Sequence, residues 1–155
     1  TTFSPKMKLT RGMLVTILHN MEGKPNVSGK SKFPDVQNTN EYYYSAVKWA
    51  SKNNIVNGYN NGKFGPNDPI TREQLAVMLN QYSIYKGTYK KTNADFTKFS
   101  DSNKISDFAK WGMNWAVGTG VITGTTEKTL IPQGTASREE AAAMIYKYFL
   151  SLKNS

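Results

Sequence analysis

The chain has 155 residues, which is the usual length of one folded domain. Of these residues, 38% are hydrophobic and 12% are aromatic. It is therefore too rich in core-forming side chains to be disordered, although its mean hydropathy of -0.57 indicates a strongly polar surface. The 20 Lys and Arg residues outnumber the 11 Asp and Glu residues. The resulting net charge of +9 favours polyanions such as nucleic acid or an acidic polysaccharide, unless the lysines only solvate the surface.

The sequence lacks the features of a membrane protein and of an enzyme. No apolar run approaches the ~20 residues that span a bilayer, so we expect no membrane partner. Cysteine is absent, and no metal-spaced histidines, nucleophile motif or phosphate loop are present. We therefore predict no catalytic residue, no metal and no cofactor in this chain, which leaves room for an enzyme fused upstream. The single histidine, His19, is expected on the surface in the last turn of a helix.

The first predicted element is a helix near residues 10–22. Thr10 is a typical N-cap residue, but Met13 cannot return a hydrogen bond to it. The helical period then predicts one apolar stripe, formed by Leu14, Ile17, Leu18 and Met21.

The next elements form a complete unit of helix, loop and helix. A helix near 41–53 has Tyr42, Ala46, Trp49 and Ala50 on one face. The loop "NGYNNGKFGPNDP" follows, with the Gly and Pro residues of tight turns. A helix near 71–85 begins with the capping-box spacing of Thr71 and Gln74. Its predicted core stripe consists of Leu75, Met78, Leu79 and Tyr82.

The same unit then recurs. A helix near 107–118 has Phe108, Trp111, Gly112 and Trp115 on one face. A last helix near 137–150 has a second capping box, Ser137 with Glu140, and the expected stripe Ala141, Met144, Ile145 and Tyr148. At an offset of 66, residues 33–82 align with 99–148 without a gap. At an offset of 61, the start of the chain aligns with the second repeat: Phe3 with Phe64, Pro5 with Pro66, Thr10 with Thr71 and Arg11 with Arg72.

This self-similarity predicts a repeat protein. We expect one domain over residues 1–155, with a partial repeat at 1–25 and full repeats at 33–87 and 99–152. The linkers are too short to separate independent folds when a single repeat cannot bury its own apolar face. The expected fold is all-α, a pseudo-threefold bundle in which the three second helices pack around a common centre and Leu14, Leu75 and Ala141 are buried together.

These motifs resemble the S-layer homology family. The resemblance rests on "FPDV" at 33–36, "WASKNNIVNGY", "GKFGPNDP", and "ITREQLA" at 70–76. The third repeat departs from the pattern, with "FSD" at its start, "TLIP" in its loop and Ser137 in place of threonine. Of the first repeat only the second half is present, and Gly12 stands where the family usually has Ala or Glu.

The resemblance implies a helical spindle that attaches exported proteins non-covalently to the bacterial cell wall. Its implied ligand is an acidic secondary cell-wall polysaccharide, commonly ending in a pyruvate ketal on N-acetylmannosamine. We accordingly expect a monomeric domain of a larger surface protein, located outside a Gram-positive cell. The implied ligand-binding residues lie in grooves between repeats: Asp35 and Asp101, Trp49 and Trp115, and Arg11, Arg72 and Arg138. To these we add Gly58 of the loop, and Trp111, which repeat two replaces by Ser45.

The chemistry of arginine fits this role independently of the resemblance. A guanidinium can grip a ketal carboxylate with two charge-assisted hydrogen bonds, and a helix start adds unpaired N–H groups and the positive dipole end. Because only the repeat around Arg72 has every motif, we expect Arg72 to matter most for binding.

Other interpretations of these residues stay open. Each arginine could form a salt bridge with an acid of the neighbouring repeat, such as Asp35 or Asp101. The tryptophans could be core, with Trp111 the most exposed, and Asp35 could cap a turn. The fold could also serve a structural or protein-binding purpose. Nucleic acid is not an expected partner, because the lysines are scattered and no base-reading motif is present.

Overall fold

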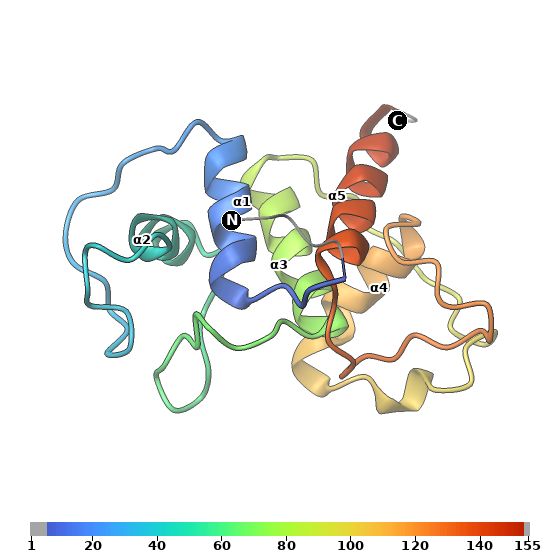
Figure 1. Cartoon of the computed structure of the whole chain (residues 1–155). Helices are drawn as coiled ribbons and strands as arrows, with labels where there is room; N and C mark the ends of the chain where they lie inside the picture. The colour runs from blue at the N-terminus through green and yellow to red at the C-terminus, as the bar shows by residue number, and fades with distance from the viewer. Residues whose placement is uncertain (1–5, 154–155) are drawn as a thin grey trace. The chain divides into compact units, whose positions relative to one another are not determined.

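The computed structural model describes residues 6–153, so Phe3 and Pro5 lie outside the described residues. This part of the chain is helical and contains no β-strand, which confirms the all-α prediction. The helices in chain order are α1 (Arg11–Met21), α2 (Tyr44–Lys52), α3 (Arg72–Tyr85), η1 (Ser102–Lys104), η2 (Asp107–Ala109), α4 (Lys110–Gly118) and α5 (Arg138–Lys153) (Figure 1). None of the described helices is long and apolar enough to cross a membrane.

The second helix of each repeat begins at the predicted cap. In α1 the Thr10 hydroxyl accepts from the backbone N–H of Met13 at 3.1 Å. In α3 the exchange is reciprocal: Gln74 N–H donates to the Thr71 hydroxyl at 3.2 Å, and the Gln74 side chain accepts from Thr71 N–H at 3.0 Å. In α5 Glu140 N–H donates to the Ser137 hydroxyl at 3.1 Å. These caps satisfy backbone donors that a helix start leaves unpaired.

The first helix of each repeat begins later than the sequence pattern suggests. Helix α2 starts at Tyr44 rather than near 41, and α4 starts at Lys110, after the short turn η2. The residues at their N-cap positions, Tyr43 and Ala109, make no side-chain capping hydrogen bond. Because the preceding residues lie outside the helices, Tyr42 and Phe108 are 54% and 63% exposed instead of joining the core.

The chain divides into two compact units that cut across the repeats. One unit is Leu9–Pro69, and the other comprises residues 6–8 and 70–153 of the described chain. The first unit packs α1 on α2 and the second packs α3 on α4. Each unit therefore joins the second helix of one repeat to the first helix and loop of the next, because a single repeat does not bury its own apolar face.

The core of the Leu9–Pro69 unit follows the predicted pattern only in part. Leu14 and Leu18 are fully buried, whereas Ile17 and Met21 are 36% and 38% exposed, so the predicted stripe on α1 is too wide. His19 is buried rather than on the surface: Nε2 lies 2.9 Å from the Pro25 carbonyl, and its ring lies 5.2 Å from that of Trp49. The tryptophan thus fills the space between the two helices.

The core of the other unit is built from the predicted α3 stripe and from aromatic side chains of α4 and α5. Leu75 and Leu79 are fully buried. The Tyr148 ring lies 5.9 Å from the ring of Trp115 and 6.0 Å from that of Tyr82. Aromatic pairs at such distances contribute beyond the area they bury.

Three isolated β-bridges connect equivalent points of the repeats. They pair Thr10 with Pro69, Thr71 with Thr135, and Ser137 with Lys8. Under the repeat alignment the first joins repeat one to repeat two, the second joins two to three, and the third joins three back to one. A closed threefold repeat requires this cyclic pattern, and the threefold arrangement itself stays a prediction.

Candidate functional site

Arg11, the first residue of α1, is a buried cation held by the loop of the following repeat. Its side chain is 4% exposed, and Nε donates to the Phe64 carbonyl at 2.9 Å. The guanidinium carbon lies 4.4 Å from the centre of the Tyr59 ring and 4.9 Å from that of Phe64. We call Arg11, Tyr59 and Phe64 the Arg11 site. Two aromatic faces and one carbonyl fix the plane of its guanidinium.

The terminal amino groups of Arg11 have no protein partner among residues 6–153: Nε makes the only side-chain hydrogen bond, and no ion pair forms. Burial lowers the pKa of Arg11, and the charges of Tyr59 and the nearby aspartates oppose that shift. Asp68 Oδ2 accepts from the Tyr59 hydroxyl at 2.8 Å, and neither aspartate forms an ion pair with Arg11. The two amino groups are thus available for an anion that approaches the site.

The first backbone N–H groups of α1 already have hydrogen-bond partners in the chain. Arg11 N–H donates to the Asp68 carbonyl at 2.9 Å and Gly12 N–H to the Pro66 carbonyl at 2.8 Å. The next N–H, of Met13, is taken by the Thr10 cap. In α3 the first two N–H groups likewise donate to the carbonyls of Gly134 and Pro132. The expectation of unpaired N–H groups for a ligand is therefore wrong at these helix starts, and only the side chains can bind.

Asp35 and Asp101 fasten the loops on which the arginines rest. Asp35 accepts from the N–H groups of Phe64 and Gly65 at 2.9 and 2.8 Å. Asp101 accepts from those of Leu130 and Ile131 at 2.8 and 2.9 Å. Burial alone would raise the pKa of each carboxyl, but the backbone donors outweigh it and the net pKa is lowered. Neither aspartate forms the salt bridge with arginine considered above, and Asp35 accepts from a distant loop rather than capping a local turn.

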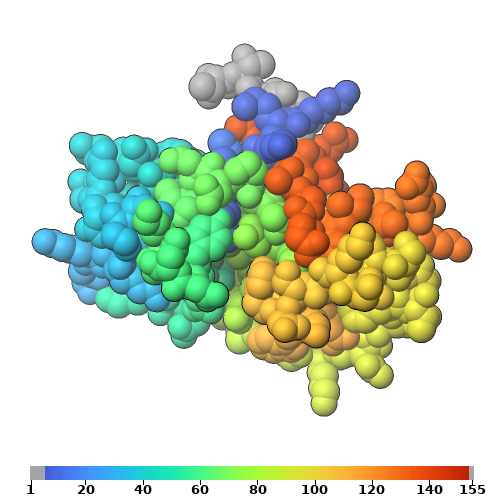
Figure 2. Space-filling view, turned by 90° about the horizontal axis from the view of Figure 1, so that it is seen from below, coloured from blue at the N-terminus to red at the C-terminus, as the bar shows by residue number. Residues whose placement is uncertain are grey.

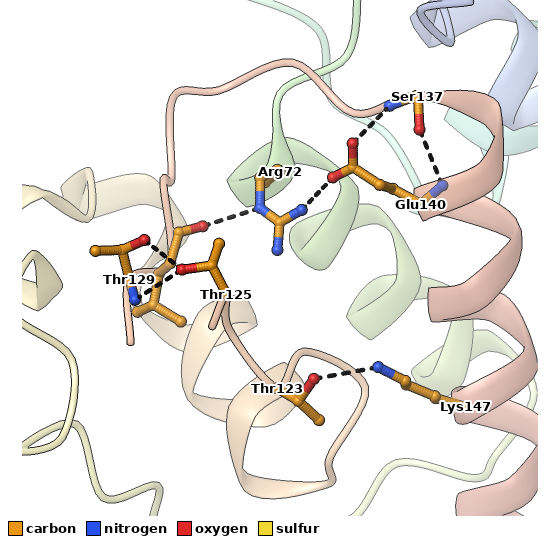
Figure 3. A network of polar contacts seen from close by, with 8 residues as sticks. Arg72, Thr123, Thr125, Thr129, Ser137, Glu140 and Lys147 are labelled. Carbon is orange, nitrogen blue, oxygen red and sulfur yellow. Dashed lines mark hydrogen bonds and ion pairs between the residues drawn. The ribbon is translucent and has the colours of Figure 1, made fainter. Parts of the chain in front are cut away.

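Arg72 repeats the geometry of Arg11 with one decisive difference. Its Nε donates to the Leu130 carbonyl at 2.9 Å, the contact equivalent to that between Arg11 and Phe64. Its Nη1, however, forms an ion pair with Oε2 of Glu140 (Figure 3). The neighbouring repeat does supply an acid, but from its second helix and not from its start. We call Arg72, Leu130 and Glu140 the Arg72 site.

The aromatic rings of the Arg11 site have no counterpart around Arg72. The repeat alignment replaces Tyr59 by Thr125 and Phe64 by Leu130. The two hydroxyls of Thr125 and Thr129 lie 2.7 Å apart (Figure 3), and Thr129 directly precedes Leu130, whose carbonyl Arg72 contacts. The two sites therefore share one backbone contact but differ in charge and in the apolar surface offered to a ligand.

A second exchange of residues distinguishes the two units. Gly12 lies against Tyr43, and a Cβ built on it would be 2.8 Å from the Pro66 carbonyl and 3.3 Å from Tyr43 Cβ. The equivalent residue in α3 is Glu73, which is 2% exposed and accepts from Ser106 N–H at 3.0 Å, and the residue equivalent to Tyr43 is the small Ala109. The large Tyr43 is thus combined with Gly12 in one unit, and the small Ala109 is combined with the large Glu73 in the other.

The other predicted site residues have mainly structural positions. Trp49 and Trp115 are 1% and 2% exposed and belong to the core. Gly58 has a φ of 80°, and a Cβ there would lie 2.6 Å from the Phe33 ring. This glycine is thus required by a left-handed turn and a close aromatic contact.

Trp111 is exposed, as predicted, and lies outside the arginine sites as defined above. It is 50% exposed, its Nε1 donates to the Tyr89 hydroxyl at 3.1 Å, and the two rings lie 5.6 Å apart. The linker 86–95 that carries Tyr89 is fastened to α4 by Asn114, whose side chain donates to the Thr92 carbonyl at 2.8 Å. Linker and helix start form one continuous surface, coloured yellow to orange (Figure 2).

Arg138 occupies the equivalent position in α5, where its N–H donates to the Met7 carbonyl at 2.9 Å. The loop that corresponds to residues 64–68 is 3–7, most of which lies outside the described residues.

Sequence reasoning missed Tyr59, Phe64 and Glu140 as parts of these sites, and Tyr43 as the neighbour of Gly12. The alignment of repeats two and three contained a signal for two of them, because Tyr59 aligns with Thr125 and Tyr43 aligns with Ala109. In a repeat protein, positions that differ between otherwise similar copies can distinguish their binding sites.

Comparison with known proteins identifies the class to which this helical repeat belongs. The family model of the S-layer homology domain matches residues 32–76 and 98–142, more than half of the chain. The chain therefore belongs to the S-layer homology family. Membership places it at the bacterial cell surface in association with the cell wall, in a module used for anchoring. Within the described residues no group of His, Cys, Asp and Glu could hold a metal ion.

Individual relatives are much longer than this chain. "Exoglucanase XynX" of Acetivibrio thermocellus is 33% identical over 94% of this chain, but only 13% of that protein is covered. "Surface-layer 125 kDa protein" of Lysinibacillus sphaericus is 27% identical over 92% of this chain and 12% of its own length. "Cellulosome-anchoring protein" of A. thermocellus is 25% identical, with 32% of its length covered. The chain thus spans about an eighth to a third of these relatives.

Proposed function

We propose that this chain holds a larger exported protein non-covalently on the cell wall by binding a secondary cell-wall polysaccharide that carries carboxylates. A pyruvate ketal on N-acetylmannosamine is the group that fits best, because it joins one carboxylate to a sugar ring with apolar faces. The chain would act as a binding module, and any catalysis would come from other parts of the exported protein.

The observation that carries this proposal is the state of Arg11. Its guanidinium is oriented by the Phe64 carbonyl and two aromatic rings, while both terminal amino groups lack a partner among the described residues. Among the described residues these amino groups are not fully buried, so a ligand carboxylate can reach them and take the place of solvent. The half-buried Tyr59 ring lies under the Arg11 guanidinium, so a carboxylate bound by Arg11 would bring its sugar beside this ring.

The contacts in the structure favour a different arginine from the one that the sequence motifs favour. The sequence motifs favour Arg72, because its repeat is the most complete. The contacts favour Arg11, since Arg72 already has an acidic partner in Glu140. We therefore place the principal carboxylate-binding site at Arg11.

Binding to purified sacculi tests the proposal. The chain should bind sacculi that retain their polysaccharide and fail to bind after the ketal or the polymer is removed chemically. Arg11→Ala should weaken binding more than tenfold, because a charge-assisted pair contributes about 1.5–3 kcal/mol. Arg11→Lys should also bind poorly, since lysine keeps the charge but lacks the planar fork.

The control measurements separate binding from folding. Circular dichroism should show that the Arg11 variants remain helical, and Lys24→Ala, which removes an exposed charge from the same unit, should bind normally. Unchanged binding of a folded Arg11→Ala variant would reject the site. Equal binding to sacculi with and without the polysaccharide would instead favour a protein-binding use of the fold.

A further inference from the structure

The two arginine sites differ most in the carboxylate that Arg72 already holds. Oε2 of Glu140 pairs with Nη1 of Arg72, and Nε of Arg72 is occupied by the Leu130 carbonyl (Figure 3). A carboxylate in contact with a guanidinium is also what the ketal of the proposed ligand would supply. Glu140 therefore occupies, within the chain, a position that a ligand carboxylate would take.

We infer that Glu140 closes the Arg72 site to carboxylate ligands, so that the two arginine sites of this chain are unequal. The inference rests on the proposed function for the identity of the natural ligand. An incoming carboxylate would have to approach within contact distance of the Glu140 charge, and the repulsion would cancel most of the attraction to Arg72. Arg11 has no ion-pair partner among the described residues; Asp68 and Asp35 act on its charge from nearby, but neither is in ion-pair contact with the guanidinium.

Glu140 is held in place from two sides. Its backbone N–H donates to the Ser137 hydroxyl at 3.1 Å, and its Oε1 accepts from Ser137 N–H at 3.5 Å. One carboxylate oxygen thus completes the cap of α5 while the other faces Arg72. The side chain is 44% exposed and that of Arg72 is 14% exposed, so the closing carboxylate lies at the surface, where an approaching ligand would meet it.

Glu140 has two roles, capping α5 and pairing with Arg72, and the residue at the equivalent position of α3 shows which substitution separates them. The equivalent residue of α3 is Gln74, which completes the Thr71 cap with its side-chain oxygen at 3.0 Å and carries no charge. Glu140→Gln should therefore preserve the helix start and release Arg72. The matched control is Glu139→Gln, which removes the same charge from an exposed neighbouring position.

Binding to sacculi with an Arg11→Ala background isolates the Arg72 site. We expect Arg11→Ala/Glu140→Gln to bind about fivefold to tenfold more tightly than Arg11→Ala, the change expected from removing a partly screened charge at contact distance. Adding Arg72→Ala should abolish the gain, and Arg11→Ala/Glu139→Gln should show none. A folded Arg11→Ala/Glu140→Gln variant that gains nothing would overturn the inference.

A small carboxylate tests the inference independently of the polysaccharide. Sodium pyruvate is titrated into the full chain while the arginine Nε–H resonances are followed by NMR. The Arg72 resonance should move in Glu140→Gln and stay in place in the wild type and in Glu139→Gln. An Arg72 resonance that moves equally in all three would overturn the inference. If no variant binds sacculi but Arg72 responds to pyruvate as expected, the proposed polysaccharide is wrong and the closure by Glu140 stands.

Discussion

At the scale of single residues, hydrogen bonds to backbone groups decide what each charged side chain can do. Asp35 and Arg11 illustrate this, because both contact residue Phe64 through its backbone. Asp35 accepts the Phe64 N–H, and Arg11 donates to the Phe64 carbonyl. The aspartate therefore holds the loop on which the arginine rests, and its contribution to any binding is one of positioning.

Asp35→Asn should destabilise the fold and weaken binding together. Asparagine keeps the shape but replaces one acceptor by a donor that faces a backbone N–H, which should cost about 1.5–3 kcal/mol. Urea unfolding of the full chain measures this loss. Asp95→Asn serves as the control, because Asp95 accepts only from Thr97 two residues away in an exposed turn. Equal stability of Asp35→Asn and the wild type would show that the loop is held by other contacts.

The lowered pKa values of Asp35 and Asp101 set the sign of the acid response. The folded state binds these protons less readily than the unfolded state, whose carboxyls titrate near the ordinary value of 3.8. The stabilisation is therefore complete above that pH and is lost as the pH falls through the lowered folded values. We expect the free energy of unfolding to fall more steeply below pH 3.8 in the wild type than in Asp35→Asn. Parallel curves from acid-dependent urea melts would contradict this.

The exchange of Gly12 and Tyr43 for Glu73 and Ala109 is a second feature at this scale. Gly12→Ala should cost about 1–3 kcal/mol, because its Cβ would be 2.8 Å from the Pro66 carbonyl with Tyr43 behind it. The same change should cost less in a Tyr43→Ala background, because position 43 then carries the small residue that the equivalent position, Ala109, already has. Melts of the two single variants and the double variant measure this coupling, and additive losses would mean that the two residues do not compete for space.

At the scale of elements, caps explain why the second helix of each repeat was easier to locate than the first. Thr10, Thr71 and Ser137 place a hydroxyl at the residue where each helix begins. The first helices have Tyr43 and Ala109 at that position and begin only where packing against the second helices fixes them. Periodicity alone extended them by about a turn too far.

Thr71→Ala tests the cap of α3. It should lower the free energy of unfolding by about 1–2 kcal/mol, because the helix start loses its hydroxyl acceptor and the Gln74 side chain loses its reciprocal geometry. Thr71→Ser, which keeps the hydroxyl as Ser137 does in α5, should be nearly neutral in the same thermal melt. A serine variant as unstable as the alanine variant would assign the effect to the threonine methyl group instead.

At the scale of the whole molecule, the register of the three repeats predicts a closed threefold arrangement. In such an arrangement the buried faces of α1 and α3 meet, and the methyl groups of Leu14 and Leu75 lie in one core. Both side chains are fully buried. Nuclear Overhauser effects between these methyl groups should therefore be observed in a methyl-labelled sample. Their absence, with separate unfolding of the two units, would contradict a common centre.

The amino-acid sequence was enough to predict the helices, the caps of the second helices and the repeat that marks the family. These features depend on neighbours within a few residues, such as Thr71 and Gln74, or on periodicity, and both can be read along the chain. Trp111 was correctly expected to be the exposed tryptophan, because the equivalent position in repeat two carries the polar Ser45.

Which arginine keeps side-chain donors without a partner among the described residues depends on contacts between distant parts of the chain. Arg11 is oriented by a carbonyl 53 residues away, and Arg72 is neutralised by a glutamate 68 residues away. In sequence the two arginines look alike, and Arg72 even has the more complete motif around it. The state of a guanidinium depends on the charges and carbonyls within a few ångströms, and those neighbours are set by how one repeat packs on the next.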